Sequence, residues 1–186
     1  MLQALLDSAG LRPEDVEIVE YPDFGQGAAV AQGAVDAATG FANNEPVQLQ
    51  LAGIETTILH VDEIVPLPGP GLISGTRTIE SKGDAIRAFV RATLRAMGDI
   101  VAVPSKGLDA AIVAVPDLGA DRAKQGAVLD ATIRAWQGSG TGSGSAALGS
   151  INEADWAASL AFMAGLGLVA GPVTVDQLVR ADLLPR

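Results

Sequence analysis

The sequence predicts an α/β fold, and three observations support that prediction. Residues 2–61 alternate short apolar runs typical of strands with helical stretches that end at glycine. Residues 65–75 are rich in proline and glycine, and the chain beyond them has the three- and four-residue apolar spacing of helices. With 48% hydrophobic and 18% charged residues, a chain of 186 residues can bury a substantial core.

The first elements predicted are a helix, a strand and a second helix. Residues 2–6 carry a leucine stripe of helical spacing that stops at Gly10. The apolar run 16–21 predicts a strand, and the small residues 28–32 predict a short helix closed by Gly33. The turn between this strand and this helix lies at the end of the strand.

The same alternation continues through the next thirty or so residues of the chain. Residues 35–42 predict a strand, residues 45–52 predict a helix that ends at Gly53, and residues 56–61 predict another strand. An order of strand, helix, strand, helix and strand favours parallel pairing with right-handed crossovers.

The later part of the chain is predicted to be helical. Residues 65–75 contain too much proline and glycine for a central strand except over 71–74, which indicates a connection between two bodies. Residues 86–101 form the clearest helix, with apolar side chains on one face and three arginines on another, and it ends near Pro104. Further helices are predicted at 108–115, 121–136, 153–165 and 175–179.

Glycine and serine dominate residues 138–150, which predicts a flexible surface loop. These glycines do not indicate a phosphate-binding loop, because the required Gly-Lys-Ser/Thr ending is absent and no strand precedes them. The tract is therefore left out of the candidate sites.

Composition excludes several classes of function. The net charge of −10 argues against general binding to nucleic acids or to anionic lipid surfaces. The lack of cysteine excludes thiolate nucleophiles, zinc–thiolate sites and iron–sulfur clusters, and a single histidine, His60, excludes a multi-histidine metal centre. We therefore predict no catalytic residue, no metal site and no cofactor. No apolar run approaches the ~20 residues of a membrane helix, and the start of the sequence shows no signal peptide.

The strongest candidate for a ligand site is the string Gly-Phe-Ala-Asn-Asn-Glu-Pro at residues 40–46, where a predicted strand ends and a helix begins. Ligands of open α/β sheets collect at such strand ends. Asn43, Asn44 and Glu45 offer amide donors, amide acceptors and a carboxylate, which suit a neutral or weakly basic heterocycle better than an anion. Phe41 could supply a stacking face.

The same residues also have a purely structural interpretation. Asn44 is placed to cap the helix, Glu45 complements the helix dipole, and Pro46 suits the first helical turn. Taken alone, the stretch favours this capping interpretation. The turn at residues 21–26 has the same placement at a neighbouring strand end, and two turns facing one cleft favour a binding site.

Several segments together resemble the substrate-binding proteins of ABC importers, in the branch that binds thiamine-pyrimidine precursors, riboflavin and sulfonates. The segments are Leu-Leu-Asp-Ser-Ala-Gly-Leu at 5–11, Gln-Gly-Ala-Val-Asp-Ala at 32–37, the string at 40–46, Ile-Arg-Ala-Phe-Val-Arg-Ala-Thr at 86–93, Trp156, and Leu-Leu-Pro at 183–185. The Asn-Asn-Glu-Pro part is the most specific of them and points to the pyrimidine or flavin side of the branch.

The resemblance implies a type II periplasmic-binding-protein-like fold with one α/β lobe and the C-terminal helices of an incomplete first lobe. Residues 1–68 would form the second ligand-binding lobe, and residues 69–186 the return crossing and the helical part of the first lobe. A hinge is expected at residues 66–71. The resemblance places the ligand against Asp23, Phe24, Gly25, Phe41, Asn43, Asn44 and Glu45.

The function implied by the resemblance is that of the solute-binding component of an importer, which takes a small nitrogen heterocycle and meets permease and ATPase subunits. For the family this implies a periplasmic or other extracytoplasmic location. Family members begin with a signal peptide and about half of the first lobe, neither of which precedes Leu2 in this sequence. A truncated chain is therefore expected to expose apolar surface or to cover it by self-association.

Three alternatives remain open at this point. Eukaryotic relatives of this branch make the thiamine pyrimidine, but they use a cysteine-rich iron motif and a reactive histidine, and this chain has no cysteine. A sulfonate- or nitrate-type binding protein is the second alternative. A truncated fragment that binds no ligand is the third, since a cleft needs both of its walls to desolvate a ligand.

Overall fold

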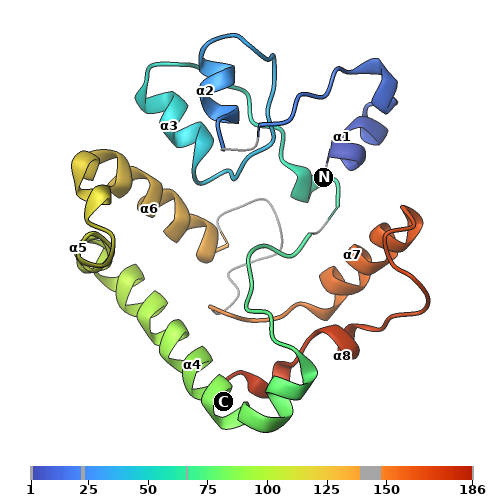
Figure 1. The fold of residues 1–186 in the computed structure, drawn as a ribbon, viewed down its shortest axis with the longest axis vertical. Coiled ribbons are helices and arrows are strands. Elements are labelled where there is room, and N and C mark those ends of the chain that lie inside the picture. The colour runs from blue at the N-terminus through green and yellow to red at the C-terminus, as the bar shows by residue number, and fades with distance from the viewer. Residues whose placement is uncertain (1, 22–23, 66, 139–147, 186) are drawn as a thin grey trace.

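The computed structural model describes residues 2–21, 24–65, 67–138 and 148–185, and the structure of the chain below refers to these residues. Helices and short helical turns follow one another along the chain, joined by long irregular segments (Figure 1). The α-helices are α1 (Leu2–Ser8), α2 (Gln26–Ala31), α3 (Glu45–Leu51), α4 (Thr76–Ala102), α5 (Pro104–Ala114), α6 (Arg122–Trp136), α7 (Glu153–Gly165) and α8 (Val175–Leu178). The 3₁₀ turns are η1 (Pro13–Asp15), η2 (Val61–Glu63), η3 (Pro116–Asp121) and η4 (Ala181–Leu183).

The helices predicted from periodicity and end signals are confirmed. Gly10, Gly33 and Gly53 follow α1, α2 and α3 with φ of 68°, 68° and 76°, the left-handed conformation that favours glycine at a helix end. Asn152 caps α7, because its Oδ1 accepts from the backbone N–H of Ala154 at 3.0 Å and of Asp155 at 3.4 Å.

Helix α4 is longer than its apolar spacing predicts. It begins at Thr76, ten residues before the stripe that starts at Ile86, and it is kinked at Lys82 (φ −132°, ψ 26°). The kink lies between Ser81, whose hydroxyl donates to the Arg77 carbonyl at 2.7 Å, and Gly83. No residue of α4 is buried, so its apolar stripe is only partly covered by the rest of the described chain.

The predicted strands do not form in the described residues, and this part of the α/β prediction is wrong for the structure. Residues 16–21, 35–42, 56–61 and 71–74 are irregular, turn or 3₁₀ backbone. A strand is defined by hydrogen bonds to a neighbouring strand, and no such ladder joins these segments within the described part of the chain. The β-branched residues of these segments favour strands, but the segments have no neighbouring strand with which to pair among the residues that the structure describes.

The helices pack as a sequence of neighbours and not around a single deep core. Helix α2 contacts α3, α3 contacts α6, α6 contacts α5, and α5 contacts α4, while the C-terminal turn η4 packs against α4. Figure 1 shows the segment 67–75 crossing the middle of the molecule toward α4. The buried apolar side chains are few: Ala4, Leu6, Ala29, Leu49, Val65, Ile133, Leu160 and Leu183.

The prediction of a flexible loop at 138–150 falls mainly on residues 139–147, which lie outside the described residues. The proposed division into lobes at 68/69 stays a prediction. Among the described residues, no helix combines the length and the apolar character that crossing a bilayer requires.

Candidate functional site

The two turns that the sequence singles out lie against each other. The amide of Gln26, the first residue of α2, donates from Nε2 to Glu45 Oε1 at 3.4 Å, and Glu45 is the first residue of α3. Helices α2 and α3 are in contact, and both lie at the top of Figure 1. The turn before α2 and the turn before α3 therefore share one side of the molecule.

Glu45 holds this arrangement together through its carboxylate. Oε2 accepts from the backbone N–H of Phe41 at 2.7 Å, and Oε1 accepts from Asn44 Nδ2 at 3.3 Å as well as from Gln26. Glu45 is half-buried and accepts three hydrogen bonds. Hydrogen bonds to a half-buried carboxylate stabilise the fold more than those to an exposed one. Its charge also complements the N-terminus of α3.

The two asparagines tie the turn to helices rather than pointing freely outward. Asn43 Nδ2 donates to the hydroxyl of Thr132 on α6 at 2.8 Å, and that hydroxyl donates in turn to the Val128 carbonyl. Asn44 Oδ1 accepts from Gln48 Nε2 at 2.8 Å. Asn44 occupies the N-cap position of α3 but makes no side-chain capping bond, so the capping interpretation is wrong for its side chain.

The aromatic residues of the two turns are exposed. The side chain of Phe24 is 86% accessible, and Phe24 has φ 53°, which is uncommon for a residue other than glycine. Phe41 is 60% accessible, and its backbone is fixed by the bond to Glu45. Gly25 is the N-cap of α2, and Asp23 lies outside the described residues. Each of the two turns joined through Glu45 thus carries an exposed aromatic residue.

Other groups do not add chemistry to this cluster. Within the described residues, no group of three or more histidine, aspartate or glutamate side chains is placed to hold a metal ion. His60 lies with Nδ1 3.6 Å from Asp62 Oδ1 at the exposed start of η2. Two hollows of about 410 and 400 Å³ are lined by residues of other segments. The cluster is therefore a hydrogen-bonding surface and has no metal centre among the described residues.

Comparison with known proteins assigns the chain to a family. Residues 1–107 match the family model described as NMT1/THI5 like, and this match covers more than half of the chain. The chain belongs to the NMT1/THI5-like family. The match includes both turns and the whole α2–α3 pair.

The chain is also similar to a curated protein, the riboflavin-binding protein RibY of Chloroflexus aurantiacus. The two are 33% identical over 186 residues, an alignment that covers 99% of this chain and 52% of RibY. The chain thus spans about half the length of this relative. No solved structure matches the chain significantly. The family prediction made from the sequence is confirmed.

Sequence reasoning missed three residues that shape the cluster. Gln26 and Gln48 stand beside the predicted residues in the sequence, and their amides could have been included as partners of a nearby carboxylate or amide. Thr132 lies 89 residues from Asn43 along the chain, and nothing in the local sequence indicates that α6 packs against this turn. Such a contact depends on tertiary packing.

Gly40 gives a test of how closely the carboxylate is held. A Cβ at Gly40 would lie 2.7 Å from Glu45 Oε2, whereas a Cβ at Gly27 would lie at an ordinary 3.5 Å from Glu45 Cγ. Gly40→Ala should therefore displace the carboxylate and lower the free energy of unfolding by about 1–2 kcal/mol, within the usual cost of overpacking. Gly27→Ala, inside α2, should be neutral or stabilising by about 0.5–1 kcal/mol.

Urea unfolding of the two glycine variants and the parent chain measures this difference. Both substitutions add the same methyl group within reach of the same side chain, but only Gly27→Ala also gains helix propensity, so each variant is compared with the parent chain as well. Equal unfolding midpoints for Gly40→Ala and Gly27→Ala would show that Glu45 is not held against Gly40.

Proposed function

We propose that this chain supplies a ligand-binding surface of a solute-binding protein for a small nitrogen heterocycle, with riboflavin as the first candidate. The observation that carries the proposal is the joining of two turns through Glu45, with Phe24 and Phe41 left exposed in those turns. Membership of the NMT1/THI5-like family and similarity to a riboflavin-binding protein support it.

The polar groups of the cluster keep capacity for a ligand. Asn43 uses one amide hydrogen on Thr132, and its Oδ1 has no protein partner among the described residues. A carboxylate offers about four acceptor positions, and Glu45 uses three of them. These acceptors suit the N–H edge of a pyrimidine or flavin ring.

The aromatic residues complete this scheme. A flat heterocycle has two π-faces, and Phe41 and Phe24 can each cover one by stacking. Asp23 and Gly25, which belong to the same turn, would contact the ligand near Phe24, and Asn44 would hold Glu45 in place. A sulfonate fits less well, because the Glu45 carboxylate would repel an anion held against it.

We further propose that the role is transport and not catalysis. The ligand would be closed between two lobes by a hinge in the connection near residues 66–71 and handed to the permease and ATPase subunits of an ABC importer in an extracytoplasmic compartment. The sequence has no cysteine, which argues against an iron-dependent thiamine-pyrimidine synthase. Capture of a ligand needs a second wall, since binding sites bury most of the ligand surface.

Flavin fluorescence tests the proposal in a hybrid protein in which this chain replaces the matching part of RibY. The fluorescence of riboflavin should be quenched in a saturable way as the hybrid is added. Phe41→Ala should weaken binding by about tenfold or more, the loss expected for one stacked aromatic face. Phe89→Ala is the matched control, because Phe89 on α4 is likewise 60% accessible and stands outside the cluster.

A ligand panel separates the proposal from its rivals. Riboflavin, hydroxymethylpyrimidine and thiamine should raise the melting temperature of the hybrid more than an alkyl sulfonate does. A sulfonate that binds most tightly would overturn the role given to Glu45, and equal losses in the two phenylalanine variants would remove the cluster from the site.

A further inference from the structure

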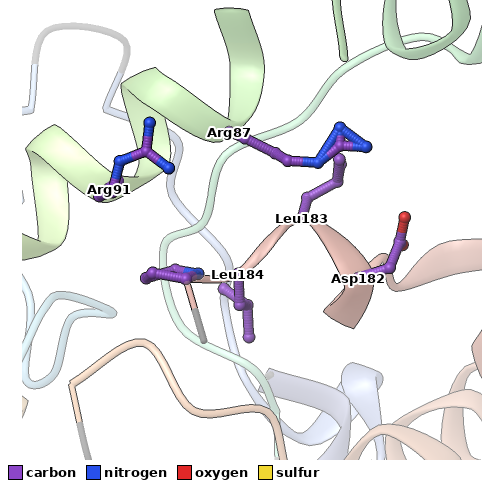
Figure 2. A pocket seen from close by; sticks show the side chains of 6 residues that line it. Arg87, Arg91, Asp182, Leu183 and Leu184 are labelled. Atoms are coloured by element: carbon purple, nitrogen blue, oxygen red, sulfur yellow. The ribbon is translucent and has the colours of Figure 1, made fainter. Parts of the chain in front are cut away.

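One of the two hollows named above lies between α4 and the C-terminal segment and has the size of a ligand site. Its volume is about 410 Å³, within the range of small-molecule sites. In Figure 2 the side chains of Arg87 and Arg91 come from α4, and those of Asp182, Leu183 and Leu184 come from the C-terminal segment. The lining residues are Arg87, Arg91, Asp182, Leu183, Leu184 and Pro185.

Packing builds this hollow from two separate elements. Leu183 is only 7% accessible and is one of the few buried apolar residues of the chain, so it anchors η4 against α4. The guanidinium of Arg180 donates to both carboxylate oxygens of Asp182, at 2.7 and 2.8 Å. The wall opposite α4 is thus fixed by one apolar contact and one bidentate ion pair.

The charge balance of the hollow is positive. Arg91 makes no hydrogen bond or ion pair with any described residue, and Arg87 makes only a long contact of 3.4 Å with the exposed Asp84. Asp182 is paired with Arg180, which lowers the pKa of that carboxyl, and the charge of Arg87 lowers it further, so this one carboxylate is shared between Arg180 and Arg87. The lining therefore carries two guanidinium groups and one carboxylate, and that carboxylate is shared with Arg180.

We propose that this hollow binds the phosphate group of a phosphomonoester that carries an apolar substituent. Arg87 and Arg91 are four residues apart on one helix, which puts their Cβ atoms about 5–6 Å from each other on the same face. Guanidinium groups match phosphate oxygens in bidentate pairs, and a dianion balances two such groups better than a carboxylate does. Leu184 and Pro185 would cover the substituent.

This site is distinct from the surface under Proposed function. Helices α2 and α3 lie at the top of Figure 1, whereas the C-terminus and the start of α4 lie at the bottom, along the longest axis of the molecule. The net charge of −10 weakens attraction of anions to the surface as a whole. Binding at the hollow therefore has to come from the local arginine pair.

Calorimetric titration of the 186-residue chain with phenyl phosphate and with inorganic phosphate tests the proposal. Phenyl phosphate should bind saturably and more tightly than inorganic phosphate, and Arg91→Gln should weaken it about tenfold, the loss expected for one charge-assisted bidentate pair. Arg95→Gln, one turn further along α4 and outside the lining, should change the affinity less than twofold.

The source of the phosphate is decided by a second arm. Sedimentation with phosphatidylcholine vesicles that contain phosphatidic acid shows whether a lipid headgroup is accepted. Arg91-dependent binding to these vesicles assigns a lipid, and Arg91-dependent binding to phenyl phosphate alone assigns a soluble ester. Equal losses in Arg91→Gln and Arg95→Gln, or no saturable binding in either arm, overturns the proposal.

Discussion

The 186-residue chain is expected to bind an apolar-surface dye strongly and to elute from a sizing column ahead of a globular monomer of 18.9 kDa. The expectation follows from its surface. The chain exposes 12945 Å², whereas a folded monomer of this mass exposes about 8,300 Å². An excess of about 4,600 Å² is larger than the area that a stable protein–protein interface normally buries.

Large apolar side chains on the segments predicted as strands contribute to this excess. Ile73 is 99% accessible, and Ile18 and Leu59 are more exposed than buried. Their backbone donors and acceptors also lack strand partners within the described part of the chain. An unpaired, apolar extended segment is a template for pairing with another chain. Association or aggregation is the direct consequence.

The hybrid with RibY is the control for this prediction. If the remaining half of that relative covers the exposed segments, the hybrid should elute at its own monomer mass and the dye signal should fall severalfold. The prediction would be contradicted if the 186-residue chain is monomeric over a tenfold range of concentration and causes no increase in dye fluorescence.

The helices were predictable because their signals are local. Gly10, Gly33 and Gly53 mark helix ends by their own conformational freedom, and Asn152 caps α7 with its own side chain. These signals can be identified from the local sequence because they do not depend on tertiary packing. The largest boundary error was the start of α4 at Thr76, where the helix begins ten residues before its apolar stripe.

The strands were not predictable in the same way. A strand forms only when it pairs with another strand, and the sequence of one segment does not show which segment lies next to it. Residues 16–21 have the composition of a strand and remain irregular. The cluster was predicted in part for a related reason. Glu45 and Phe41 could be found from their neighbours, whereas the bond from Asn43 to Thr132 depends on how α6 packs.

Glu45→Ala should expose the backbone N–H of Phe41 to solvent. Its bond to Glu45 Oε2, at 2.7 Å, is the shortest that the carboxylate makes. A hydrogen bond to a charged group contributes about 1.5–3 kcal/mol, so amide exchange at Phe41 should speed up about 12- to 150-fold. Gln26 and Asn44 would lose their acceptor as well, and the contact between α2 and α3 would weaken.

Exchange measured residue by residue gives the readout, with Glu55→Ala as the matched control. Glu55 is exposed and makes no hydrogen bond or ion pair with any described residue, so its removal should leave Phe41 unchanged. Glu45→Gln should fall between the two, because its amide oxygen can still accept from Phe41. Unchanged exchange at Phe41 in Glu45→Ala would contradict the role of the carboxylate.

The same variants distinguish two roles of the Glu45 carboxylate, which are holding the turn in place and accepting a hydrogen bond from the ligand. In the RibY hybrid, Glu45→Ala should lower the affinity for riboflavin about tenfold, since it removes both the fixed backbone of Phe41 and an acceptor for the ring. If Glu45 acts only by holding the turn, Glu45→Gln recovers the affinity to the same partial extent as the protection of Phe41. If the carboxylate also accepts from the ligand, Glu45→Gln recovers that part of the protection but leaves the affinity low, because an amide NH2 group replaces one of the two acceptor oxygens. Full affinity in Glu45→Ala would exclude both roles.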